Sequence, residues 1–280
     1  MNYRHAFHAG NHADVLKHCI LLALIDALQQ KSTPLFVLDT HAGRGQYLLT
    51  SEQAGKTGEF KDGILKLLGA SDLPAPVQRY LRAVQADNPV GALVEYPGSP
   101  LLIAQALRDH DRLAACELQP EEAAALKSLF KGDTRVGVHQ RNGYEAMPAL
   151  LPPKEKRGLV LIDPPYEAQD EEYPRIVEAL KLALTRWPTG QFAIWYPIKR
   201  RATLQPFFRK VAHLPVKSAL AIELLVRPDD SPLRMNGSGM LLLNPPWQFD
   251  QLIEPCLREL ARLLGERGAS WRQTWLIEPK

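Results

Sequence analysis

The segment Leu159-Val160-Leu161-Ile162-Asp163-Pro164-Pro165-Tyr166 carries the most informative pattern in this chain of 280 residues. Its apolar residues predict a buried parallel strand over Gly158 to Ile162. A carboxylate, two prolines and an aromatic ring follow at the carboxyl end of that strand, which is where open α/β sheets bind their ligands. The prolines have no N–H to donate, so the backbone carbonyls of the turn remain free to accept from a substrate amine.

This arrangement suits methylation of an exocyclic amino group, whose nitrogen lone pair is delocalised into its ring and is a poor nucleophile. Two acceptors, the Asp163 carboxylate and the Pro164 carbonyl, would hold both N–H groups so that the lone pair becomes available. Tyr166 would offer a flat face on which a base stacks. Asp163, Pro164 and Tyr166 are therefore the candidate catalytic residues, and a purely structural Pro-Pro loop is the alternative.

Outward from this segment, short apolar runs alternate with helical patterns, which predicts a doubly wound α/β fold with a mostly parallel sheet. Two consecutive strands near the end, Ser218 to Val226 and Gly239 to Leu243, have no helix between them, so we expect a terminal antiparallel hairpin. The predicted sheet has seven strands. They are expected at residues 35–38, 113–118, 135–139, 158–162, 191–196, 218–226 and 239–243.

The stretch 51–96 interrupts this alternation, because it is polar, helical and broken by Pro74, Pro76 and Pro89. We interpret it as a helical insertion subdomain within a main domain made of residues 1–50 and 97–280. A helix capped by Asn11 starts the main domain. We expect this helix and the tail before it to lie over the site.

Polar residues at three other strand ends suit a cofactor that contains adenosine. Asp39-Thr40-His41-Ala42-Gly43-Arg44-Gly45 lacks the third glycine of a dinucleotide fingerprint, since position 48 is leucine. Its D-x-x-x-G-x-G pattern instead resembles the first motif of methyltransferases that use S-adenosylmethionine, and Gly43 would let the cofactor approach the backbone. A tight turn without a ligand is the alternative.

The next two strand ends carry Glu117 and Asn142-Gly143. Glu117 can accept hydrogen bonds from both ribose hydroxyls of a nucleoside, although it could also be an ordinary surface acid. The Asn142 amide can pair with the edge of an adenine ring, or it can belong to an ordinary Asn-Gly turn.

A second Pro-Pro motif, Asn244-Pro245-Pro246-Trp247, has the same shape as the first. It follows the last predicted strand. If that strand is antiparallel, its carboxyl end points away from the cofactor edge. We therefore expect the catalytic site at Asp163 rather than at Asn244.

The opening residues are more specific than these patterns. Asn2-Tyr3-Arg4-His5 and Phe7 to His18, together with Leu38 to Gly43, Tyr96 to Pro100 and Trp195-Tyr196-Pro197, resemble the RlmJ family of bacterial 23S ribosomal RNA adenine-N6 methyltransferases nearly from end to end. The resemblance implies a Rossmann-like class I methyltransferase fold. It also implies S-adenosylmethionine as cofactor and the N6 amine of one adenine, the family's adenine 2030, as target.

The same resemblance implies roles for single residues. It matches Asp163 to the family's catalytic residue and Tyr3 to a position implicated with the RNA. Family members often carry an acid where this chain has Asn142, so that contact would lack charge. A buried structural histidine is the alternative for His18. The implied cofactor contacts are His18, His41, Ser99, Glu117, Asn142, Gly143 and Asp163.

Positive charge that could bind RNA is local, because 34 Lys and Arg nearly balance 31 Asp and Glu. Arg4 and Lys17 would face the RNA if the first helix packs over the site. The tail of residues 1–10 is either a disordered terminus or a lid. The run from Lys199 to Lys217, which is either an RNA patch or a solvated helix face, contains Lys199, Arg200, Arg201, Arg209, Lys210 and Lys217 but no acid.

Composition restricts the remaining choices. The three cysteines lie far apart without a CxxC pattern, so we expect core thiols in a reducing compartment, and no disulfide framework or metal site. No apolar run approaches the length of a membrane helix, which favours a cytoplasmic protein without a membrane partner, and we expect a monomer. A DNA adenine-N6 methyltransferase and a non-catalytic RNA-binding module are the competing functions.

Overall fold

The computed structural model describes residues 5–167, 169–232 and 235–279. The strands are β1 (Phe36–Asp39), β2 (Gln46–Leu48), β3 (Glu95–Pro97), β4 (Arg112–Glu117), β5 (Val136–Gln140), β6 (Gly158–Ile162), β7 (Gln191–Ile198), β8 (Ala219–Leu225), β9 (Gly237–Leu243) and β10 (Ser270–Ile277). The α-helices are α1 (His12–Gln29), α2 (Glu52–Thr57), α3 (Ile64–Leu68), α4 (Ala75–Gln85), α5 (Ser99–Ala106), α6 (Pro120–Leu129), α7 (Gly143–Leu150), α8 (Gln169–Arg186), α9 (Gln205–Val211) and α10 (Phe249–Leu264). Short 3-10 helices lie at η1 (His5–Phe7), η2 (Glu59–Lys61) and η3 (Arg201–Leu204).

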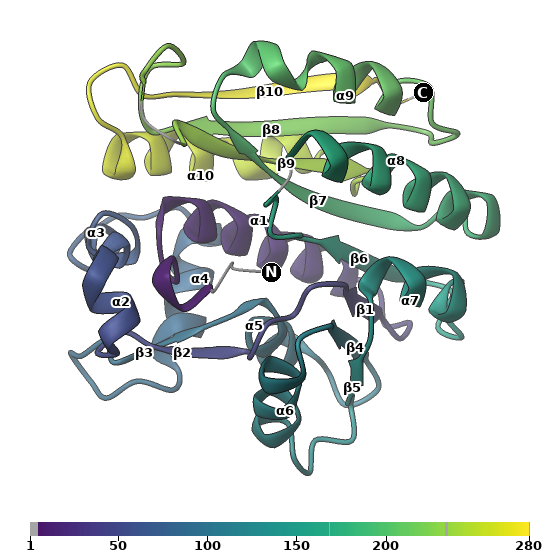
Figure 1. Ribbon diagram of the computed structural model, residues 1–280, viewed down its shortest axis with the longest axis horizontal. Coiled ribbons are helices and arrows are strands. Elements are labelled where there is room, and N and C mark those ends of the chain that lie inside the picture. Colours follow the sequence, from purple (N-terminus) through teal and green to yellow (C-terminus); the bar gives the residue numbers. More distant parts are fainter. Residues whose placement is uncertain (1–4, 168, 233–234, 280) are drawn as a thin grey trace.

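Within the described residues, eight strands form one twisted sheet in the order β10-β8-β9-β7-β6-β1-β4-β5 (Figure 1). The strands from β5 to β7 are parallel to one another. β9 runs antiparallel to both of its neighbours, β7 and β8. The structure therefore confirms the predicted mostly parallel Rossmann-like sheet with a terminal antiparallel hairpin.

Both faces of the sheet are covered, and the sequence of its central strands shows why. On β6, Leu159 and Leu161 enter the core shared with α1, α4, α5 and α10, whereas Val160 and Ile162 enter the core shared with α7, α8 and α9. Side chains alternate between the two faces of a strand. A strand that is covered on both faces must therefore be apolar at every position.

Helix α1 passes through the first of these two cores and is buried over most of its circumference (Figure 1). The Asn11 side chain caps it by accepting hydrogen bonds from the backbone N–H groups of Ala13 and Asp14, both at 3.0 Å. The cap fixes where the helix begins, and this start places the polar residues of its first turns at the carboxyl ends of the parallel strands.

Two sequence predictions of local structure were wrong. The sheet has eight strands rather than seven, because β10 pairs antiparallel with β8 beyond the predicted hairpin. A further strand, β2, is absent from the predicted strands, and it pairs antiparallel with β3. Both strands are only partly buried, so their sequences lack the continuous apolar runs that revealed the central strands.

Helices α2, α3 and α4 lie between β2 and β3 in the chain, within the predicted insertion. They pack against the N-terminal segment: the backbone N–H of Ile64 donates to the Gly10 carbonyl at 2.9 Å, and α4 packs along α1. The division into a subdomain of residues 51–96 and a main domain stays a prediction. Among the described residues, no helix combines the length and apolar character needed to cross a membrane.

Gly143, the first residue of α7, offers a test of the packing between α7 and β1. A Cβ there would lie 2.1 Å from the Thr40 carbonyl oxygen, whereas a Cβ at Gly55 in α2 would meet nothing within 4 Å. We expect Gly143→Ala to lower the free energy of unfolding by about 1–3 kcal/mol through overpacking. The same change at Gly55 should be neutral or slightly stabilising. Equal effects of the two variants in urea denaturation would contradict this packing.

Candidate active site

A cavity of about 800 Å³ opens at the carboxyl ends of the central parallel strands. It lies on either side of β1, where the strand order changes direction, which is the usual ligand position in doubly wound sheets. Ten of the predicted site residues line it. They are Lys17, His18, His41, Gly43, Ser99, Glu117, Asn142, Gly143, Asp163 and Pro164.

Asp39 ends β1 beneath the cavity and organises the turn that follows. It is fully buried; its carboxylate accepts from the Ser99 hydroxyl at 2.6 Å and from the backbone N–H of His41 at 3.2 Å. Burial raises the pKa of Asp39 to about 7, although the Ser99 hydrogen bond opposes the shift. Gly98 occupies the N-cap position of α5, and Ser99 is its first helical residue.

Two histidines, His18 and His41, line the cavity. The Nδ1 of His18 is paired with the Tyr96 hydroxyl at 2.8 Å, and its Nε2 is buried without a hydrogen-bond partner among the described residues. Burial lowers the pKa of His18 to about 3 and that of His41 to about 4. Both rings are therefore neutral near pH 7. His18 Nδ1 is paired with Tyr96 and His41 Nδ1 with the Thr40 hydroxyl at 2.8 Å, so each ring has only its Nε2 left, as a donor or an acceptor according to the tautomer.

Glu117 closes the cavity beside the glycine turn. Its carboxylate accepts from the backbone N–H of Gly43 at 2.9 Å and of Gln119 at 2.7 Å. Burial raises the pKa of Glu117. Gly43 itself has a left-handed φ of 62°, and a Cβ there would lie 2.3 Å from the Tyr47 hydroxyl, so the turn requires glycine on both counts.

Asn142 and Gly143 start α7 rather than form an isolated turn. The Asn142 side chain accepts from the backbone N–H of Tyr144 at 2.9 Å, which is a helix cap. The Tyr144 hydroxyl donates to Glu172 at 2.6 Å, and its ring contacts His41 edge-on. Tyr144 and Glu172 also line the cavity. They thus join α7 to α8, the helix that follows the Asp-Pro-Pro-Tyr turn.

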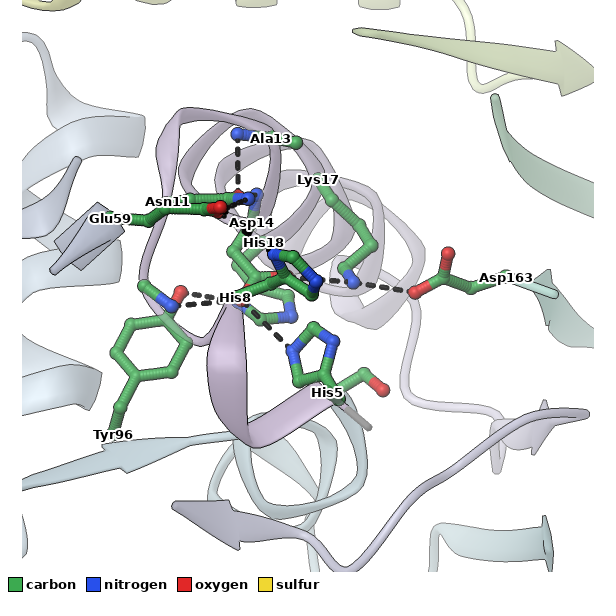
Figure 2. Close-up of polar contacts among 12 residues, drawn as sticks. His5, His8, Asn11, Ala13, Asp14, Lys17, His18, Glu59, Tyr96 and Asp163 are labelled. Atoms are coloured by element: carbon green, nitrogen blue, oxygen red, sulfur yellow. Dashed lines mark hydrogen bonds and ion pairs between the residues drawn. The ribbon is translucent and has the colours of Figure 1, made fainter. Parts of the chain in front are cut away.

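A network of ionisable side chains runs from the N-terminal segment to Asp163 (Figure 2). The Lys17 ammonium lies 2.5 Å from the Asp163 carboxylate and 2.9 Å from the Asp14 carboxylate. Asp14 also contacts His5 Nε2 at 3.0 Å and accepts from the backbone N–H of Gly10 at 2.9 Å. Lys17 is only 4% exposed, so its charge acts inside the protein.

Neighbouring opposite charges keep Lys17 and Asp14 ionised in spite of their burial. Burial alone would lower the pKa of Lys17, but Asp14 and Asp163 raise it above its ordinary range. Burial opposes ionisation of Asp14, and yet His5 and Lys17 bring its pKa well below the ordinary value. Lys17 and Asp14 are therefore both charged at neutral pH, with a fixed geometry between α1 and the end of β6.

Comparison with known proteins identifies the family of this chain. Residues 32–277 match the family described as Ribosomal RNA large subunit methyltransferase D, RlmJ. Relatives from Haemophilus influenzae and Escherichia coli, both named Ribosomal RNA large subunit methyltransferase J, are each 42% identical over 278 residues, which is 99% of both chains.

The chain belongs to this family.

A crystal structure of a Legionella pneumophila protein, 38% identical, superimposes on this RlmJ-family chain with a TM-score of 0.89 over 95% of this chain and 98% of that one.

Some predicted site residues of this RlmJ-family chain lie outside the cavity. Tyr166 is not among the described residues that line it; its hydroxyl donates to the Trp195 carbonyl at 2.6 Å, and its ring packs against Trp195 and Tyr173. Tyr3 and Arg4 lie outside the described residues. Their predicted contacts with substrate stay predictions.

The basic run is largely exposed, as an RNA-binding surface requires. Lys199, Arg200, Arg209 and Lys210 are exposed, and so is Lys217. Arg201 differs, because its guanidinium pairs with the buried Glu223 at 2.8 Å. Its charge is therefore neutralised inside the protein.

Sequence reasoning missed His5, Asp14, Tyr144 and Glu172 as part of this site. His5 and Asp14 belong to the histidine-rich opening, but their pairing depends on the fold of η1 against α1, which a sequence pattern does not show. The second motif at Asn244 follows the antiparallel β9, so its exclusion from this edge is confirmed. Among residues 5–167, 169–232 and 235–279, no group of three or more His, Cys, Asp or Glu side chains could hold a metal ion.

Lys17→Met tests the buried ion pairs. It would leave two carboxylates in the interior without their cation, so we expect the free energy of unfolding to fall by about 3–5 kcal/mol. Lys181→Met is the matched control, because Lys181 pairs with Glu178 at 2.7 Å while both side chains are more than half exposed. The control should cost no more than about 0.5 kcal/mol in chemical denaturation. A Lys17 loss equal to that of the control would refute the buried pairing.

Asp39→Asn tests the environment at the end of β1. Because the pKa of Asp39 is raised to about 7, its proton stabilises the fold at acidic pH, and this contribution is lost as the pH rises through 7. The variant keeps an uncharged side chain. Relative to the wild type, it should therefore gain roughly 2 to 3 kcal/mol of unfolding free energy between pH 5 and pH 8. A difference between variant and wild type that does not change over this range, measured by urea denaturation, would count against it.

Proposed function

We propose that this chain transfers a methyl group from S-adenosylmethionine to the N6 amine of an adenine in 23S ribosomal RNA. The observation that carries the proposal is the Asp163-Pro164 pair at the end of β6, which faces the cavity while Lys17 holds the carboxylate at 2.5 Å. Family membership supports the reaction class, since the relatives carry ribosomal RNA methyltransferase in their names.

The cavity fits an adenosine cofactor that also carries an amino acid. Its lining includes His18, whose Nε2 has no hydrogen-bond partner among the described residues, the carboxylate of Glu117 and the turn at Gly43. We assign cofactor binding to His18, His41, Gly43, Ser99, Glu117, Asn142, Gly143 and Asp163. When bound, the cofactor supplies an electrophilic methyl group on a sulfonium.

The chain's own residues would bind and orient the amine. The Oδ2 atom of Asp163 is engaged by Lys17, whereas its Oδ1 atom and the Pro164 carbonyl have no hydrogen-bond donor among the described residues. These two oxygens can accept the two N–H groups of an adenine amine and hold its lone pair toward the cofactor. The carboxylate also stabilises the positive charge that develops on the nitrogen during transfer.

Lys17 has a different role in this proposal from a direct RNA contact. Its ammonium is buried between two carboxylates, so it positions Asp163 rather than reaching a phosphate. RNA binding falls instead to the exposed cations between Lys199 and Lys217. Tyr166 would stack on the base if the target adenine, once unstacked from its helix at a cost of a few kcal/mol, displaces the present packing around Trp195.

The proposal also covers the location of the protein, its oligomeric state and its substrate. An enzyme that modifies 23S ribosomal RNA works in the cytoplasm, and a single chain contains every group that we assign, so a monomer suffices. No observation favours DNA as the substrate or a binding module without catalysis, and both are outcomes of the experiment below.

Asp163→Asn should reduce methyl transfer by at least about a hundredfold, because one acceptor of the amine and its charge are both lost. The assay follows tritiated methyl groups into protein-free 23S RNA and into duplex DNA, and mass mapping then identifies the modified nucleotide. Asp62→Asn is the control, since the side chain of Asp62 is 80% exposed, and it should leave the rate unchanged. Transfer to DNA alone, or an Asp163 variant as active as the wild type, would contradict the proposed function.

A further inference from the structure

The second Pro-Pro motif, Asn244 to Trp247, lies at the edge of the sheet opposite the candidate active site. It follows β9, and Leu243 at the end of β9 is paired with Phe192 near the start of the parallel β7. The active-site cavity therefore does not use this motif. The motif nevertheless holds one side chain, that of Trp247, out in the solvent.

The turn is held rigidly by Asn244. Its amide nitrogen donates to the carbonyls of Pro188 at 3.1 Å and Gly190 at 2.9 Å, and its amide oxygen accepts from the backbone N–H of Lys217 at 3.0 Å. Its own backbone N–H donates to Ser218 at 2.9 Å. These four hydrogen bonds fix the direction in which the chain leaves the sheet.

This rigid turn leaves a tryptophan exposed to solvent. Trp247 is 81% exposed, although Phe249, two residues later, is completely buried. An indole ring gains stability from burial, and a fixed turn that keeps one in solvent gives up that gain. Tryptophan is enriched at binding interfaces, where its ring is covered by a partner, and this one adjoins a cavity.

A cavity of about 700 Å³ adjoins Trp247, and its chemistry indicates the ligand. Lys31 and Arg157 line it together with four glutamines, and no acidic residue is among the described residues of its wall. Neither cation forms an ion pair with a described residue; the Arg157 guanidinium donates to the Thr33 hydroxyl at 2.9 Å. Most of its N–H groups remain available.

We propose that this surface is a second nucleotide-binding subsite for the RNA substrate, an inference that rests on the proposed function. A base stacks on Trp247, Lys31 and Arg157 pair with the flanking phosphates, and the glutamine amides bind base or sugar edges. A wall that carries cations and amides but no acids is complementary to RNA, which has negatively charged phosphates and flat bases. A protein partner would call for a wider apolar area, but apart from Trp247 the only exposed apolar side chain among the described residues of this wall is Leu252.

The two sites lie at opposite ends of the same strand. Arg157 precedes β6 and Asp163 follows it, so they are separated by roughly 20 Å at 3.3 Å per residue. A single nucleotide cannot reach both, whereas a folded RNA can. The subsite should therefore affect binding of long RNA and leave the chemical step unchanged.

The experiment measures binding of a fluorescent 23S RNA fragment by anisotropy, together with the kinetics of its methylation. Trp247→Ala should weaken binding roughly tenfold and raise KM for the fragment by a similar factor, with kcat and KM for S-adenosylmethionine unchanged. Trp247→Phe should restore most of the affinity, because a phenyl ring still stacks. Leu182→Ala, which alters an exposed leucine on α8 that is 62% exposed, is the control and should bind like the wild type.

A double variant, Lys31→Gln with Arg157→Gln, tests the phosphate contacts. It should lower the slope of log Kd against log salt by about 1.4, since each lost phosphate contact to a single strand contributes about 0.7. An unchanged RNA affinity for Trp247→Ala would overturn the inference, and so would a changed sedimentation with unchanged RNA binding, which would identify a protein contact. Failure of the proposed function would show separately, as a wild-type protein that binds the fragment but does not methylate it.

Discussion

The ion pair between Lys17 and Asp163 is the interaction on which the site depends. It joins α1, which starts the domain, to the turn after β6, although 146 positions of sequence separate the two residues. A buried charge is costly without a partner, so Lys17 can occupy this place only while Asp163 and Asp14 are both correctly positioned. The pair therefore couples the folding of the N-terminal segment to the geometry of the acceptor that would hold the substrate amine.

The rest of the architecture serves this coupling. The Asn11 cap fixes the start of α1, and hence the height at which Lys17 and His18 meet the ends of the strands. Gly143 allows α7 to approach the Thr40 backbone. This contact brings the turn after β5 next to the turn after β1. The burial of α1 and of both faces of the central strands leaves polar groups concentrated at one edge, where a cavity of about 800 Å³ collects them.

The sequence predicted the parts of this structure that have a strong local signature. The strand from Gly158 to Ile162 and its polar end followed from an unbroken apolar run, and the placement of the two Pro-Pro motifs at opposite edges of the sheet followed from strand direction. The half-buried β10 and the short β2 lack such runs, so pattern alone missed them. Lys17 was predicted to face RNA if the first helix packs over the site. The helix does lie there, but Lys17 is buried between two carboxylates that only the tertiary fold brings together.

A double-mutant cycle on kcat tests the central claim most directly, with Lys17→Met, Asp163→Asn and the double variant assayed on 23S RNA. If Lys17 acts through Asp163, the double variant is no slower than Asp163→Asn alone. If the two losses instead multiply, Lys17 contributes to catalysis independently of Asp163, and the account of a positioned acceptor is wrong.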